Sequence, residues 1–194
     1  SEILMFGTNI LANGANISTG WSKDLRIGFG TNFPTASISI TSGAKLTVGG
    51  STYIGSATEG QGDAAYNVFV TGAGSEFNGS GAGGDLYLRA DGMLTIQNEA
   101  SASFSYFNGK GVLNVLNATF KSLNFNIADS GKLTFVNGAK ATLGNTATAS
   151  TARGDISVGG DETELNLIGD IKYGRTNTAA DFTVKNNAAV TVNG

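Results

Sequence analysis

The chain of 194 residues contains no cysteine, no histidine and a single proline. The lack of cysteine excludes disulfides and thiolate metal sites, and it is compatible with export from the cell. The lack of histidine excludes catalytic triads that use an imidazole base and zinc sites that use imidazole ligands. A catalytic site in this chain would therefore depend on carboxylates, and a non-catalytic role is the simpler expectation.

Charged residues are also scarce, at 14% of the chain, and the formal net charge is only -3. Low net charge combined with 40% hydrophobic residues predicts a folded chain rather than a disordered one. Lysine and arginine are scattered and the isoelectric point is near 4.8, so we expect no nucleic-acid binding. The longest apolar run, residues 3–6, is far shorter than the roughly 20 residues of a membrane-spanning helix. No membrane-spanning segment is predicted.

Glycine, by contrast, is abundant, with 29 residues. Together with Ser, Asn and Asp it separates short runs in which aliphatic and polar side chains alternate, such as residues 68–70, 85–88 and 93–96. Alternation over about three to five residues between turn-forming clusters is typical of short β-strands. Because no apolar pattern of helical period is sustained, the sequence predicts an all-β fold.

A turn unit recurs along the chain. The first three copies are Asn13-Gly14-Ala15, Ser42-Gly43-Ala44 and Thr71-Gly72-Ala73, and their central glycines stand 29 residues apart. Later copies, such as Asn98-Glu99-Ala100 and Asn137-Gly138-Ala139, follow at uneven intervals. Strands this short bury a core only when each pairs with its copy in the next turn of the chain, so the repeat indicates a solenoid.

We therefore predict one domain over residues 1–194, a single-stranded parallel β-helix. General crossover preferences make it right-handed. Three segments without an apolar pattern, residues 57–65, 146–151 and 176–180, are predicted to be loop insertions at corners. The alternative is an antiparallel sandwich, in which Asn137-Gly138 would be a hairpin turn between residues 133–136 and 140–143.

The middle of the chain resembles a known family. Its repeat reads VFVTGAGSEFN at residues 68–78, LYL at residues 86–88 and GMLTIQN at residues 92–98. These phrases resemble the passenger repeats of bacterial type V autotransporters and related surface adhesins. The chain departs from the family pattern at Arg89 and Glu99, where glycine would be usual. The clear resemblance covers residues 40–102, and weaker echoes continue to Gly194.

The resemblance implies a parallel β-helix that is secreted or displayed on the exterior of the bacterial outer membrane. It implies no single activity, because the family carries adhesins, aggregation factors and enzymes on one scaffold. We expect a structural or adhesive module that contacts extracellular surfaces, glycans or other copies of itself. The alternative is a polysaccharide-binding or polysaccharide-degrading β-helix, such as a phage tail-fibre segment.

The chain stops within a repeat phrase at residues 190–194. A last coil of this kind would present unpaired backbone and apolar rows, so we predict either end-to-end association of copies or a segment of a longer repeat protein.

Acidic residues are densest at Asp161, Glu162 and Glu164. On an extended strand Glu162 and Glu164 would point to the same face about 7 Å apart, which would suit an acid and base pair or a calcium ion. The competing interpretation is a solvated corner. No other cofactor or metal site is indicated by the sequence.

Two further groups are candidates for recognition. Arg153, Gly154 and Asp155 spell the integrin-binding tripeptide after a loose segment, although Asp155 would serve equally well as a turn residue before a strand. Tyr87 and Tyr106 are candidates for an exposed platform for sugar rings. Alternation places Tyr106 on the same face as Phe104, and stacking within the core is the alternative for these aromatic residues. Asp85 and Asp91 are expected to pair with Arg89.

Overall fold

The computed structural model describes residues 2–20, 23–28, 35–56, 65–174 and 180–194. This part of the chain is almost entirely β, with one short 3-10 turn, η1 (Gly81–Gly83). Its strands form two sheets, which we name the large sheet and the small sheet. The large sheet contains fourteen strands: β1 (Glu2–Met5), β3 (Asn16–Ser18), β4 (Asp24–Ile27), β6 (Lys45–Val48), β7 (Thr52–Ile54), β9 (Glu76–Gly79), β10 (Asp85–Leu88), β12 (Ser101–Gly109), β14 (Thr119–Ile127), β16 (Lys140–Gly144), β17 (Ser150–Ala152), β19 (Glu164–Ile168), β20 (Ile171–Tyr173) and β22 (Ala189–Asn193).

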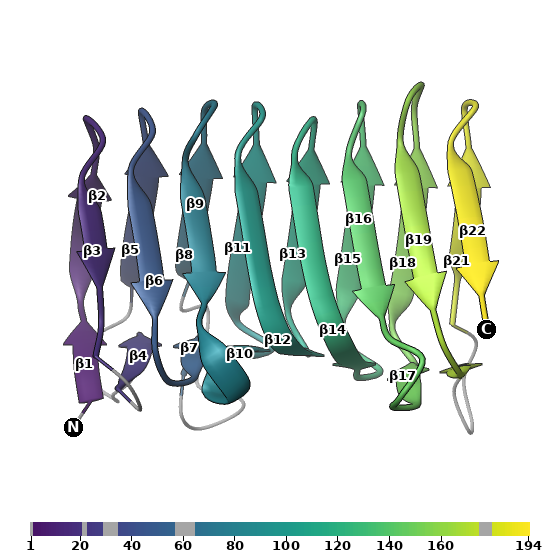
Figure 1. The fold of residues 1–194 in the computed structure, drawn as a ribbon, viewed down its shortest axis with the longest axis horizontal. Coiled ribbons are helices and arrows are strands. Elements are labelled where there is room, and N and C mark those ends of the chain that lie inside the picture. Colours follow the sequence, from purple (N-terminus) through teal and green to yellow (C-terminus); the bar gives the residue numbers. More distant parts are fainter. Residues whose placement is uncertain (1, 21–22, 29–34, 57–64, 175–179) are drawn as a thin grey trace.

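The small sheet contains eight strands: β2 (Gly7–Leu11), β5 (Thr35–Thr41), β8 (Ala65–Thr71), β11 (Gly92–Gln97), β13 (Val112–Leu116), β15 (Lys132–Val136), β18 (Asp155–Gly159) and β21 (Phe182–Lys185). The chain rises along a small-sheet strand, turns and returns along the large sheet, then begins the next coil. Figure 1 shows these coils side by side, with the two termini at opposite ends of the stack.

Every strand pair in the described part of the chain is parallel. This confirms the predicted all-β parallel solenoid, and the right-handed sense of the coil stays a prediction. The sandwich alternative is wrong, because β15 and β16, which flank Asn137-Gly138, lie in different sheets and do not pair with each other.

The turn at Asn137-Gly138 nevertheless has the backbone of a tight hairpin turn. Both residues have positive φ, 54° and 83°, and the Ala139 N–H donates to the Val136 carbonyl at 3.2 Å. Two central residues of positive φ are typical of the type I′ turns that close hairpins. Here the turn passes from one sheet to the other, which is why the local sequence alone could not distinguish the two folds.

The coils shorten along the chain. Asn9 pairs with Ile38, 29 residues later, as the glycine spacing predicts, whereas Leu94 pairs with Leu113, only 19 residues later. Early coils use two large-sheet strands, such as β9 and β10, while β12 is one nine-residue strand that pairs with both of them. The period drifts because later coils lack the connection between these two strands.

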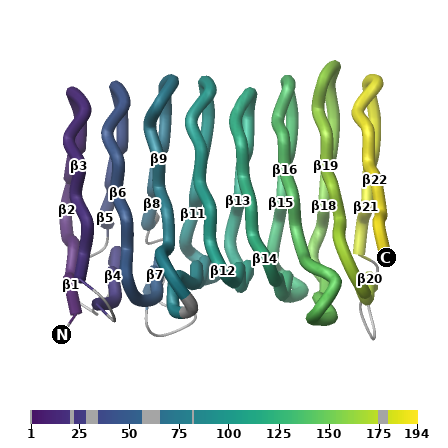
Figure 2. Tube along the Cα trace, in the orientation of Figure 1, coloured from purple at the N-terminus to yellow at the C-terminus, as the bar shows by residue number. Residues whose placement is uncertain are grey.

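The turns of successive coils lie along one edge of the stack (Figures 1 and 2). Asn98 and Glu99 both have positive φ, so Glu99 adopts the backbone that glycine usually supplies. Small buried side chains, such as Ala44, Ala100 and Ala139, follow these turns and fill the corner inside. Corner loops were predicted at three places, and one of them, the connection from β16 to β17, is described. There the Asn145 side chain accepts hydrogen bonds from two following backbone N–H groups. The other two predicted loops, residues 57–65 and 176–180, fall almost wholly outside the described residues.

Alternating residues of both sheets point inward and form one continuous hydrophobic core. Aromatic rings from neighbouring coils meet within it, and Phe107 and Phe120 make an edge contact with centroids 5.5 Å apart. Phe104 is also buried, at 2% exposure, whereas Tyr106 faces outward and is half-buried. The prediction that these two share a face is wrong, because the pairing of β12 passes from β9 to β10 between them and the strand loses its strict alternation.

The first and last coils of the described chain expose apolar side chains, most of all Ile10 at 69% and Val192 at 65%. End-to-end association stays a prediction. No helix within the described residues has the length and apolar character needed to span a membrane.

Candidate functional site

Two tyrosines form a ladder on the outer face of the large sheet. Tyr53 on β7 and Tyr87 on β10 are direct partners in the parallel register, and their ring centroids lie 4.8 Å apart with planes inclined by 10°. This separation equals the spacing of neighbouring strands, so in-register stacking alone brings the rings face to face. Tyr106 on β12 adds an edge contact to Tyr87, with centroids 6.1 Å apart.

Arginine residues flank this ladder. Arg26 on β4 is the register partner of Tyr53, and its guanidinium carbon lies 4.3 Å from the centroid of the Tyr53 ring. The same side chain pairs with Glu2 at 3.0 Å and lies 3.8 Å from Asp24. Arg26 therefore closes one end of the ladder by a cation–π contact and is neutralised by acids of its own coil.

Arg89 lies on the other side of the Tyr53 ring, with its guanidinium carbon 5.8 Å from the centroid. The backbone places Arg89 in the corner position that Gly55 occupies in the preceding coil, because the Arg89 N–H donates to Ile54 at 2.9 Å. A Cβ added to Gly55 would lie 2.6 Å from the Cβ of Arg89, and Gly55 also has a φ of 117°. Glycine in one coil thus makes room for the arginine of the next.

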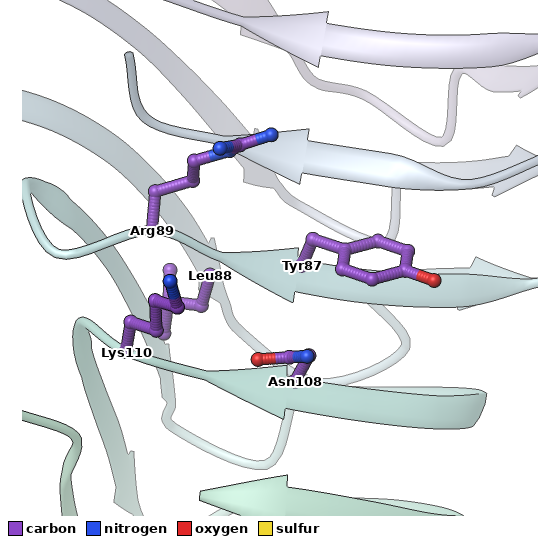
Figure 3. A pocket seen from close by; sticks show the side chains of 5 residues that line it. All are labelled: Tyr87, Leu88, Arg89, Asn108 and Lys110. Atoms are coloured by element: carbon purple, nitrogen blue, oxygen red, sulfur yellow. The ribbon is translucent and has the colours of Figure 1, made fainter. Parts of the chain in front are cut away.

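A pocket of about 180 Å³ opens beside Tyr87 and is lined by Tyr87, Leu88, Arg89, Asn108 and Lys110. Figure 3 shows the Tyr87 ring and the Asn108 amide on adjacent strands, with Arg89 and Lys110 where these strands end. Asn108 is the register partner of Tyr87, and Lys110 continues the corner position of Arg89 into the next coil by donating its N–H to the Leu88 carbonyl at 2.7 Å. The pocket thus joins one aromatic face, one amide and two cations.

The acids around the pocket are held by other groups. Burial raises the pKa of Asp85, and the hydrogen bond with Tyr87 opposes this shift. Burial also raises the pKa of Tyr87, and the negative charge of Asp85 adds to the rise. Both carboxylate oxygens of Asp91 accept from the Ser56 N–H, at 3.1 and 3.2 Å. The prediction that Asp85 or Asp91 pairs with Arg89 is wrong, since neither acid is within ion-pair distance of it.

The acidic residues Asp161, Glu162 and Glu164 do not share a strand face. Glu162 lies in the turn before β19 with a φ of 60°, while Glu164 begins that strand. The Glu164 carboxylate accepts from the Lys140 ammonium at 2.7 Å, and Asp161 accepts from Asn187 at 3.0 Å. The extended arrangement expected for the two glutamates is absent because the corner intervenes. No cluster of three acids suited to a metal ion occurs among the residues described.

The tripeptide Arg153, Gly154 and Asp155 connects β17 to β18 within the ladder of coils. The Arg153 N–H donates to Ile127 at 2.8 Å, and its guanidinium lies 3.6 Å from Asp129. Gly154 is buried, and the Asp155 carboxylate accepts from the backbone of the next coil. The tripeptide therefore follows the backbone ladder and is distant in the stack from the tyrosines, which belong to earlier coils.

Of the predicted recognition residues, the structure brings Tyr87 and Tyr106 together and adds four residues that the sequence analysis missed: Tyr53, Arg89, Asn108 and Lys110. A signal for Tyr53 was present, because Tyr53-Ile54-Gly55 and Tyr87-Leu88-Arg89 are the same phrase with arginine in place of glycine. The departure from the family pattern at Arg89 thus marks the site.

An outward aromatic face with neighbouring amide and cationic groups can hold a polar ring by stacking and hydrogen bonding. Comparison with known protein families, with curated proteins and with solved structures finds no match to this chain. The resemblance to autotransporter passengers therefore stays a prediction.

Proposed function

We propose that this chain is a non-catalytic structural or adhesive module of an extracellular or cell-surface protein, in which a β-helix displays the tyrosine ladder to glycans. The observation that carries the proposal is the face-to-face pair of Tyr53 and Tyr87 on the solvent side of the large sheet. Aromatic residues with both an apolar face and a polar group suit ligands that are themselves partly apolar and partly polar, as pyranose rings are.

The setting of the ladder supports binding rather than catalysis. The rings sit on strands that are paired on both sides, so their positions are fixed by the backbone rather than by a loop. The neighbouring carboxylates of Asp24, Asp85 and Asp91 hydrogen-bond within the protein, to Ser51, Tyr87 and Ser56 respectively. These bonds stabilise the fold around the ladder and leave the aromatic face as the main contact surface.

The size of the pocket sets the expected strength of binding. Its volume of about 180 Å³ is below the roughly 300–1,000 Å³ typical of small-molecule sites, so it would hold about one sugar unit. A single contact of this size gives weak affinity, and useful adhesion would come from several chains acting together on one polymer.

The proposal is tested by measuring how the chain binds a panel of immobilised polysaccharides, alongside the Tyr87→Ala and Tyr87→Phe variants. Tyr87→Ala should weaken binding by about tenfold, since an aromatic contact contributes about 0.5–1.5 kcal/mol beyond its buried area. Tyr87→Phe retains the ring and should bind within a factor of about three of the wild type. Circular dichroism and unfolding curves verify that both variants are folded.

Equal binding by the wild type and Tyr87→Ala would contradict the role of the ladder. Release of shortened glycan by the wild type would contradict the non-catalytic part of the proposal and would favour a polysaccharide-degrading β-helix.

A further inference from the structure

We propose that the sugar bound beside Tyr87 is acidic, a pyranose that carries a carboxylate, with its ring on the tyrosine and its carboxylate on the Arg89 guanidinium. This inference rests on the proposed glycan contact and specifies its ligand class. It is carried by the charge state of the pocket, by the position of Arg89 and by the shape of the guanidinium group.

Arg89 differs from the other arginines that the structure describes. Arg26 pairs with Glu2, and Arg153 lies 3.6 Å from Asp129. Arg89 has no carboxylate within ion-pair distance among the described residues, and its close partner is the Tyr53 ring. A half-buried guanidinium with no acidic partner is an open site for an anion, because its donors are otherwise satisfied only by water.

The corner position adds a second cation. Lys110 lies one coil further along, hydrogen-bonded through its N–H to Leu88, and it lines the same pocket as Arg89. Two neighbouring cations at one pocket raise the local potential and favour an anionic ligand over a neutral one. In the two preceding coils the same corner carries Gly28 and Gly55, so only this part of the stack presents positive charge at the ladder.

The chemistry of the lining residues favours a carboxylate attached to a sugar ring. Arginine presents a planar fork of N–H donors that matches the two oxygens of a carboxylate. The Tyr87 ring offers a flat apolar surface on the adjacent strand position, and the Asn108 amide opposite it can both donate to and accept from hydroxyl groups. A pocket of about 180 Å³ accommodates one such residue of a chain.

The test compares short oligomers of galacturonic acid and glucuronic acid with their methyl esters, which retain the ring and lose the charge. Binding to the purified chain is measured by isothermal titration calorimetry. We expect at least one acid oligomer to bind about tenfold or more tightly than its ester, since a charge-assisted bidentate contact is stronger than a neutral one. This preference should decline as salt concentration rises.

Two variants assign the preference to its residue. Arg89→Gln should bind acid and ester equally, at the level of the wild type with ester, because it removes the cation and retains the ladder. Lys132→Gln removes one positive charge from an exposed position on β15, away from the pocket, and should retain the preference.

Equal binding of acid and ester by the wild type would overturn the acidic ligand while leaving the glycan proposal standing. Tighter binding of a sulfated galactan than of either uronate, lost in Arg89→Gln, would overturn the carboxylate in favour of a sulfate ester. If the wild type binds neither acid nor ester, the acidic ligand and the proposed glycan contact both fail.

Discussion

Replacing Thr163 by valine would remove one hydroxyl from the buried corner between β18 and β19. The Thr163 side chain is 1% exposed, and its hydroxyl donates to the Gly159 carbonyl and accepts from the Gly138 N–H of the preceding coil, both at 3.0 Å. Valine has nearly the same shape but neither donates nor accepts. The substitution therefore tests how much the polar bridge between two turns contributes to the stack.

The expected loss follows from the groups left behind. The Gly159 carbonyl still accepts from the Asn137 N–H at 3.3 Å, whereas the Gly138 N–H loses the hydroxyl as partner. An unsatisfied buried donor costs about 1–3 kcal/mol in the free energy of unfolding. For a chain of this size each kcal/mol lowers the melting temperature by about 2–4 °C.

Urea denaturation followed by circular dichroism measures this loss. The matched control is Thr142→Val, the same change on the half-exposed outer face of β16, which should stay within about 0.5 kcal/mol of the wild type. If Thr163→Val and Thr142→Val had the same stability, the hydroxyl bridge would contribute nothing and the account of the corner would be refuted.

Two further predictions concern the backbone ladder and the tyrosine ladder. Gly154→Ala should lower the free energy of unfolding by about 1–3 kcal/mol, because its Cβ would lie 2.7 Å from the Ala128 carbonyl oxygen, whereas Gly20→Ala, which meets only a side-chain carbon at 3.9 Å, should change it little in the same urea titration. The raised pKa of Tyr87 favours the neutral phenol in the folded state, so stability should decline as pH rises above the ordinary value near 10. Tyr87→Phe should lose less stability over that range in denaturation curves measured at successive pH values, and an identical decline would contradict the assigned burial.

The architecture was accessible from sequence because its signals are local and repeated. Asn13-Gly14 and Ser42-Gly43 recur with the period of one coil, and the alternation beside them shows which side chains face inward. The later coils were harder to align, because a nine-residue strand such as β12 takes over the pairing of two shorter strands. The outward position of Tyr106 was missed for the same reason, since strict alternation does not hold where β12 changes partners.

The candidate site was only partly accessible, because it depends on which residues lie above one another. Tyr53 and Tyr87 are 34 residues apart, so no fixed 29-residue period brings them together. The repeated phrase at Tyr53-Ile54-Gly55 and Tyr87-Leu88-Arg89 carries the information, but it becomes visible only once the strands are paired. The acidic cluster failed in the opposite way, because neighbours in sequence such as Glu162 and Glu164 are separated by a corner.

In-register stacking is the claim on which the ladder and its ligand depend, and a distance between two spin labels tests it most directly. The chain has no cysteine, so Thr47→Cys/Thr142→Cys can be labelled cleanly. Successive register partners of Thr47 are Asn78, Ser103, Lys121 and Thr142, which places the labelled positions four strand spacings apart, about 19 Å between Cα atoms. Electron–electron double resonance should give a distribution near this value, and a Thr47→Cys/Asn166→Cys pair should be longer by one strand spacing. Distances that do not increase by this step would contradict the stacked coil.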